Sequence, residues 1–284
     1  MSIRPNNNKG SARNLPVIIF GIIVVLVLIN QLNSPQRHRH GSTPVSTGSA
    51  PAVTKPAMNP LLEMLNDSSG QMKTPSEGIA IGVAIDVSGS MNDSVKDTDG
   101  LVRPKIEIAR RCALDILKQA DSFARGHEDQ HIEVGIFEFS SRQNRPSCRQ
   151  VIPFGPIQTA AADQAVKRMQ PEGGTPIGDA MITVKQKMNA TALSRQHLLV
   201  ITDGENNQGY DPGDVVNALS RMPDEKRASV YFFAFDVSAD KFRHVRDSGG
   251  LVMAASNGQE LEQTLGYVLT GKILVEQPDV PGTN

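Results

Sequence analysis

Short apolar runs recur along the last 200 or so residues, and segments with helical periodicity separate them. Three of the runs are almost continuously apolar, which is typical of strands buried on both faces of a parallel sheet. Strands that alternate with helices predict an α/β domain: a Rossmann-like open, mostly parallel sheet with helices on both faces. The predicted strands are residues 79–85, 131–139, 150–154, 196–202, 230–235 and 251–255, and the predicted helices are residues 104–123, 160–169, 176–189, 212–222 and 259–274.

The strand at 131–139 is followed by a second short strand at 150–154, after a polar connection. Because this connection is short enough for a hairpin, we expect the pair to be antiparallel at the edge of the sheet. Upstream of the domain, residues 59–66 read NPLLEMLN. A capping residue, a proline at the first helical position and spaced leucines predict a short helix that rests on the main domain.

The N-terminal region predicts a membrane anchor. A polar, basic tail over residues 1–14 precedes an apolar run over residues 15–32, which would form a helix of about 27 Å at ~1.5 Å per residue. A cleaved signal peptide is the alternative, but no small-x-small cleavage site follows the run. We therefore expect an uncleaved, single-pass transmembrane helix, followed by a flexible Ser/Thr/Pro-rich linker over residues 33–76. The folded domain then spans residues 77–276, and residues 277–284 form a C-terminal tail.

Basic residues flank the apolar run on both sides, with Arg37 and Arg39 on the downstream side. The positive-inside rule then gives a weak preference for a cytoplasmic N-terminus. The domain is accordingly expected outside the cytoplasm, in the periplasm or on the cell surface.

Charge and cysteine content exclude some classes of protein. The net charge of −1 lacks the basic excess of a nucleic-acid-binding domain, so no nucleic acid is expected as a partner. Two cysteines, Cys112 and Cys148, are too few for a disulfide framework or a thiolate zinc site. One prediction is a disulfide between them; the alternative is that Cys112 is a small buried residue on a helix.

Three oxygen-rich clusters lie at loops of the predicted domain. Asp86, Ser88 and Ser90 follow the first strand, Thr175 stands in a glycine-rich loop before Pro176, and Asp203 follows the strand at 196–202. Each has an ordinary alternative, since Ser, Gly and Asp are turn residues and threonine before a helical proline is a common N-cap. The carboxyl ends of parallel strands, however, meet at one edge of the sheet, where ligand sites lie. Together the clusters predict a site for a hard divalent cation.

The residues of these clusters resemble a known family. D-V-S-G-S at 86–90 resembles the DxSxS signature of the von Willebrand factor A (vWA) family, part of its metal-ion-dependent adhesion site (MIDAS). G-G-T-P-I-G-D-A at 173–180 and T-D-G at 202–204 resemble the two other loops of that site. The resemblance covers residues 77–276 and all five metal-site positions, and it implies a membrane-anchored vWA protein of bacterial type.

The resemblance implies roles for these residues. Ser88 and Ser90 would bind the cation directly, Thr175 directly or through water, and Asp86 and Asp203 mostly through water. The cation would be Mg²⁺, with Mn²⁺ or Ca²⁺ as alternatives. Because it would keep much of its charge, its open position would attract a Glu or Asp side chain from a protein ligand.

The expected function is therefore that of a membrane-tethered, non-enzymatic module for protein binding, in adhesion or complex assembly. One alternative is a scaffold subunit of an envelope complex that works with an AAA-type ATPase. A magnesium-dependent hydrolase is disfavoured, because positions 88 and 90 are serines where a second aspartate would be needed. A serine hydrolase is disfavoured because D-V-S-G-S departs from G-x-S-x-G. The histidines His127, His131, His197 and His244 are expected at element starts or on the surface.

The insert at residues 92–100 contains Asp93, Asp97 and Asp99. Its spacing does not fit the calcium loop of an EF-hand. We expect a solvated rim beside the cation site, with a role in tuning that site or in binding calcium as the alternative.

Overall fold

The computed structural model describes residues 60–67, 75–143 and 147–276. The predicted anchor at 15–32, the predicted capping residue Asn59, most of the linker and the tail at 277–284 lie outside the described residues. Within the described part, no helix has both the length and the apolar character needed to cross a membrane.

A six-stranded sheet forms the centre of the domain, in the order β5-β4-β1-β6-β7-β8. All neighbouring strands are parallel except β4 and β5 at one edge, which form an antiparallel pair. The expectations of a mostly parallel sheet and of an antiparallel edge strand are both confirmed. The strands are β1 (Ser76–Asp86), β4 (Ile132–Phe139), β5 (Cys148–Ile152), β6 (Leu193–Thr202), β7 (Ala228–Phe235) and β8 (Leu251–Ala255).

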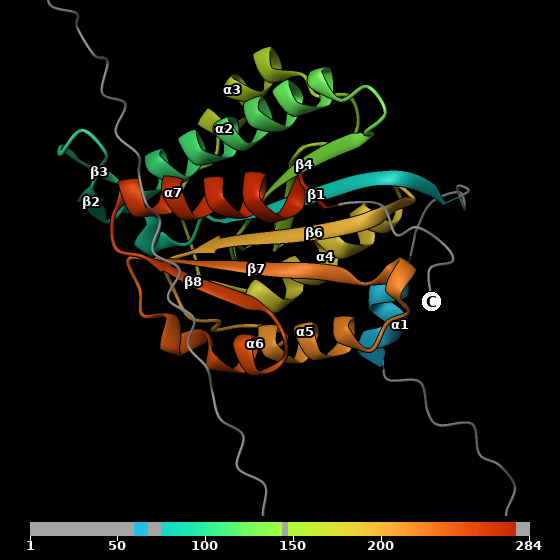
Figure 1. The fold of residues 1–284 in the computed structure, drawn as a ribbon. Helices are drawn as coiled ribbons and strands as arrows, with labels where there is room; N and C mark the ends of the chain where they lie inside the picture. Colours follow the sequence, from blue (N-terminus) through green and yellow to red (C-terminus); the bar gives the residue numbers. More distant parts are fainter. Residues whose placement is uncertain (1–59, 68–74, 144–146, 277–284) are drawn as a thin grey trace, which may run out of the picture. The chain divides into compact units, whose positions relative to one another are not determined.

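Helices cover both faces of the sheet (Figure 1), as two separate apolar cores show. One core lies beneath α2 (Lys105–Gly126), α3 (Thr159–Lys167) and α7 (Gly258–Val268). The other lies beneath α1 (Pro60–Asn66), α4 (Ile177–Asn189), α5 (Pro212–Ser220) and α6 (Arg243–Asp247). Short turns complete the described fold: η1 (Gly89–Asn92), η2 (Asp224–Lys226), η3 (Ala239–Phe242) and the π-helical turn η4 (Leu269–Ile273).

The strand β1 has the most enclosed position in the sheet, because residues 78–86 are all buried. Its apolar run packs into both cores, which explains why the run is continuous rather than alternating. Gly82 lets α4 approach closely, since a Cβ at this position would lie 2.4 Å from a methyl group of Val184. The run therefore ends in a closely packed part of the domain, and Asp86 lies at its carboxyl end.

The short helix α1 packs on α4 and α5 with Leu61 and Leu65 buried. The side-chain amides of Gln186 and Asn189 donate hydrogen bonds of 2.8 Å to the carbonyls of Met64 and Leu65. The prediction of a helix resting on the main domain is confirmed.

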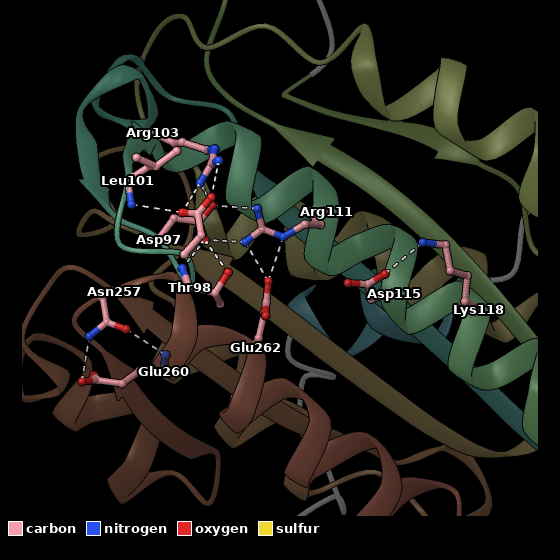
Figure 2. A network of polar contacts seen from close by, with 11 residues as sticks. Asp97, Thr98, Leu101, Arg103, Arg111, Asp115, Lys118, Asn257, Glu260 and Glu262 are labelled. Atoms are coloured by element: carbon pink, nitrogen blue, oxygen red, sulfur yellow. Dashed lines mark hydrogen bonds and ion pairs between the residues drawn. The ribbon is translucent and has the colours of Figure 1, made fainter.

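The acidic insert forms a hairpin of β2 (Ser94–Lys96) and β3 (Val102–Pro104), and the prediction of a solvated rim is wrong for Asp97. Only 3% of Asp97 is exposed, and its carboxylate accepts hydrogen bonds from Arg103 at 2.7 Å and from Arg111 at 2.8 Å (Figure 2). Arg111 also donates to Glu262 of α7 at 2.8 Å. Two arginines thus neutralise a carboxylate that would otherwise require solvent.

Two further predictions concern cysteines and histidines. Cys112 and Cys148 are both free and buried, so they form no disulfide, and Cys112 is a buried helix residue. His197, expected at an element start or on the surface, instead lies inside β6 with 2% of its surface exposed. Its Nε2 lies 2.8 Å from a carboxylate oxygen of Glu276, which gives the buried ring a polar partner.

Candidate metal centre

Asp86 is the most buried acidic group of the candidate site, with 0% of its surface exposed. One carboxylate oxygen accepts the backbone N–H of Ser88 at 2.7 Å, and the other accepts the hydroxyl of Thr202 at 2.6 Å. Burial raises the pKa of Asp86 to about 7, although the hydrogen bonds from Thr202 and Ser88 act in the opposite direction. A buried carboxylate in this setting is stabilised in its charged form by a nearby cation.

The two serine hydroxyls and Asp203 form a contiguous row of oxygens. Ser88 Oγ and Ser90 Oγ lie 3.2 Å apart, and Ser90 donates to Oδ1 of Asp203 at 2.8 Å. Ser88 is 2% exposed, whereas Ser90 is exposed. The row therefore runs from the interior to the surface, where a ligand could reach it.

The loop that carries Thr175 is fastened to the serine loop by its backbone. The N–H of Gly89 donates to the carbonyl of Gly173 at 3.0 Å, and the N–H of Glu172 donates to the carbonyl of Val87 at 2.8 Å. Gly173 has a φ of +83° and no room for a side chain, because a Cβ would lie 1.9 Å from the carbonyl oxygen of Ser141. Only glycine fits such a position.

Thr175 itself is 4% exposed and lies beside the loop that carries Asp203. A Cβ added to Gly204 would lie 3.5 Å from Thr175 Oγ1. The alternative of an ordinary N-cap is not supported, since the helix begins at Ile177 with Pro176 as its N-cap and without a side-chain capping bond. The structure thus brings the three loops that carry all five predicted residues to one edge of the sheet.

Two asparagines outside the predicted set of site residues hold the threonine loop in position. Asn207 Oδ1 accepts the N–H of Thr175 at 2.8 Å, and Asn206 Oδ1 accepts the N–H of Ile177 at 2.8 Å. Asn206 therefore caps α4 from the loop after β6. The adjacent asparagines after T-D-G were the available signal, because asparagine side chains commonly bond to nearby backbone in loops.

Three more residues near the site were also missed: Thr202, Lys105 and Asp236. Lys105, the first residue of α2, is 5% exposed, and its ammonium group lies 3.0 Å from Asp203 Oδ2 and 2.9 Å from Asp236 Oδ2. Burial lowers the pKa of Lys105, but its contacts with Asp236 and Asp203 outweigh this and raise the pKa overall. Lys105 is therefore a permanent positive charge at the rim of the site.

The donor set fits a hard divalent cation. It consists of hydroxyl and carboxylate oxygens from Ser88, Ser90, Thr175, Asp86 and Asp203, without sulfur or imidazole. Such ligands suit Mg²⁺, Mn²⁺ and Ca²⁺ rather than softer metals. The enclosed carboxylate of Asp86 gives a second reason, because no cationic side chain contacts it within the described part of the chain.

Comparison with known proteins identifies the family. Residues 81–264 match the von Willebrand factor type A domain, so the chain belongs to this family, which in general comprises modules for protein interaction and adhesion. A curated relative, the uncharacterized protein YwmD of Bacillus subtilis (strain 168), is 26% identical over 194 residues, which are 64% of this chain and 81% of the relative.

Solved structures share the fold at low sequence identity. The PilB minor pilin of Streptococcus sanguinis has a TM-score of 0.54 at 13% identity, covering 73% of this chain and 65% of that one. The pilus adhesin SpaC of Lactobacillus rhamnosus GG has a TM-score of 0.53 at 16% identity, covering 72% of this chain and 32% of that one. BatB of Bacteroides thetaiotaomicron has a TM-score of 0.52 at 16% identity, covering 70% of this chain and 100% of that one. The chain thus spans less than two thirds of PilB and about a third of SpaC.

Proposed function

We propose that this protein is a membrane-tethered binding module that recognises an acidic group of a protein ligand through a divalent cation, in adhesion or in assembly of a complex. Asp86, Ser88, Ser90, Thr175 and Asp203 would hold the cation. The observation that carries the proposal is the convergence of three loops, which contact one another through the bonds of Gly89 to Gly173 and of Ser90 to Asp203.

The contacts of the two aspartates support indirect roles for them. Both oxygens of Asp86 already accept hydrogen bonds from the chain, and those of Asp203 contact Ser90 and Lys105. We expect these engaged carboxylates to act mostly through water, and the hydroxyls of Ser88, Ser90 and Thr175 to contact the cation directly through their lone pairs. A bound Mg²⁺ would then keep water in its remaining positions and exchange one of them for a ligand carboxylate.

We propose Mg²⁺ as the physiological cation and an extracytoplasmic location for the domain, with residues 15–32 as the anchor. A minor pilin and a pilus adhesin are among the structural neighbours, which agrees with this location. We expect no catalytic turnover. In the described part of the chain, no histidine contacts the hydroxyl of Ser88 or Ser90, so the Ser–His pair of a serine hydrolase is not formed there.

Metal uptake is the first test. The full-length protein, purified in detergent and stripped with chelator, is titrated calorimetrically with Mg²⁺, Mn²⁺ and Ca²⁺. We expect one site per chain, lost in a Ser88→Ala/Ser90→Ala double variant and retained in the control Ser94→Ala, which changes an exposed serine of the hairpin. If the natural protein takes up no divalent cation, the proposal fails.

Ligand chemistry is the second test. A displayed peptide library is selected against the immobilised full-length protein in Mg²⁺, and bound peptides are eluted with chelator. We expect the eluted peptides to share a Glu or Asp whose change to Gln or Asn abolishes binding. Peptides that bind equally well in chelator, or that tolerate loss of their acidic residue, would contradict a cation-mediated mode of recognition.

A further inference from the structure

Lys105 occupies an unusual position for a lysine, buried at the start of a helix and against the acidic rim of the candidate centre. Its backbone N–H donates to the carbonyl of Asp93 at 2.9 Å, which fixes the first turn of α2. Its ammonium group reaches Asp203 on the loop after β6 and Asp236 after β7. One side chain thus links three elements at the carboxyl edge of the sheet.

The partners of Lys105 differ in exposure and in backbone conformation. The Asp203 side chain is 0% exposed and the Asp236 side chain is 43% exposed. Asp236 has a φ of +55°, a left-handed conformation in which Asp and Asn are enriched among non-glycine residues. Its N–H donates to the carbonyl of Ala255 at 2.7 Å. Asp236 is therefore held where its carboxylate meets Lys105.

We propose that Lys105 is a built-in counter-cation that limits the affinity of the centre for a divalent cation, with Asp236 acting in the opposite direction. This inference rests on the proposed function, because it concerns the same site. Lys105 neutralises the Asp203 carboxylate, so this group attracts a second cation less strongly. The positive charge of Lys105 also attracts the carboxylate of a ligand. Lys105 thus weakens binding of the metal ion and strengthens binding of the ligand.

The consequence is a pair of variants with opposite effects. Lys105→Met removes a positive charge a few ångströms from the centre and should tighten divalent binding by about tenfold or more. Asp236→Asn removes a negative charge on the outer side of Lys105 and should weaken binding by about threefold, because its partly exposed side chain is screened by solvent. Asparagine also tolerates the left-handed backbone, so this variant is expected to fold even if Lys105→Met does not.

Calorimetric titration with Mg²⁺ and Mn²⁺, together with thermal unfolding in chelator and in Mg²⁺, tests this in the full-length protein. A purely structural ion pair predicts the same direction for both variants, because each removes the Lys105–Asp236 contact. Affinities that move in opposite directions support the proposal, and affinities that are unchanged or move together overturn it.

The same measurements separate this inference from the proposed function. If the natural protein binds Mg²⁺ and Lys105→Met binds it no more tightly, only the role of Lys105 is overturned. If the natural protein takes up no cation but Lys105→Met does, Lys105 keeps the cation out and cation-mediated recognition by the natural protein is overturned. If none of the three proteins binds, both fail.

Discussion

Two buried aspartates that stand eleven residues apart in the sequence show opposite electrostatic solutions. Asp97 is held by Arg103 and Arg111, and its pKa is lowered to about 2, first by the hydrogen bond from Arg111. Among the described residues, Asp86 receives hydrogen bonds from neutral groups only, and burial raises its pKa to about 7. The two aspartates are therefore almost equally buried, but the charge of Asp97 is neutralised by arginines of the chain, whereas that of Asp86 is not paired with a cationic side chain in the described residues.

The difference separates a structural charge from a functional one. Around Asp97 the chain supplies its own cations, which join the hairpin to α2 and, through Glu262, to α7 (Figure 2). In the part of the chain that the structure describes, Asp86 accepts from a hydroxyl and a backbone N–H and contacts no cationic side chain, since Lys105 contacts Asp203 and Asp236 instead. The row of oxygens opens toward the surface at Ser90. An aspartate that is fully buried without a cationic partner is costly, and we interpret this cost as the signature of a site that receives its cation from solution.

The largest expected effect concerns Asp97. Asp97→Asn leaves Arg103 and Arg111 without their shared partner, and we expect a loss of about 3 kcal/mol in the free energy of unfolding. Denaturant unfolding in chelator and in Mg²⁺ should give the same loss, because this cluster needs no metal. Asp99→Asn is the matched control, since Asp99 also pairs with Arg103 but is exposed, and its effect should be much smaller. Equal losses in the two variants would contradict the comparison.

The second effect concerns Asp86. In chelator, Asp86→Asn should be at least as stable as the natural protein, because it replaces a buried acid with a neutral group of similar shape. At Mg²⁺ a hundredfold above its Kd, the natural protein should gain about 2.7 kcal/mol, while Asp86→Asn gains nothing. The control is Asp97→Asn, which should keep the full gain although it is less stable. A Mg²⁺-dependent gain in Asp86→Asn would show that this carboxylate does not serve the cation.

The features predictable from the sequence are those set by local pattern. The continuous apolar run of β1, the hairpin of β4 and β5 and the short helix α1 follow from periodicity and turn chemistry. The convergence of the loops of the candidate site could be predicted because Asp86 and Asp203 lie at the carboxyl ends of parallel strands, which fixes their common edge before any side chain is placed.

The features that could not be predicted depend on distant partners. Asp97 looks like any acidic loop residue until the fold brings Arg111 and Glu262 to it. Lys105 looks like a solvated residue at a helix start, because its two carboxylates follow it by about 100 and 130 residues. The contact of Thr202 with Asp86 follows from the register of the sheet, since β1 pairs with β6 and Ile85 lies opposite Ile201. Extending this register by one residue places Thr202 beside Asp86.

Lys185 provides a third kind of buried charge and the third prediction. It is 0% exposed, and its ammonium group donates to the side-chain oxygens of Gln196, at 2.9 Å, and Asn189. No carboxylate of the described residues pairs with it. Burial lowers its pKa from 10.5 to about 7. Between these values the unfolded chain binds more protons than the folded one, so stability should increase with pH from about 7 to about 10.

We expect an increase of roughly 2 kcal/mol between pH 7.5 and 9.5 from this residue alone. Lys185→Met should remove this slope, because methionine fills a similar volume without a charge. Denaturant unfolding at several pH values, in chelator, measures both proteins. The opposite sign, with the natural protein less stable at higher pH, would show that the amides hold the ammonium as strongly as carboxylates do.

The smallest effect tests the hydrogen bonds that stand in for a cation at Asp86. Thr202→Val keeps the shape of the side chain and removes the hydroxyl that donates to Asp86 at 2.6 Å, so it should cost about 1 kcal/mol in chelator. Thr183→Val is the control, because that hydroxyl donates to the carbonyl of Asp179 within its own helix and has no other hydrogen bond to the described residues. Since a bound cation would stabilise the Asp86 carboxylate by another route, the cost of Thr202→Val should shrink in saturating Mg²⁺. If the cost is the same with and without Mg²⁺, the hydrogen bond from Thr202 to Asp86 has a purely structural role, like the ion pairs of Asp97 with its arginines.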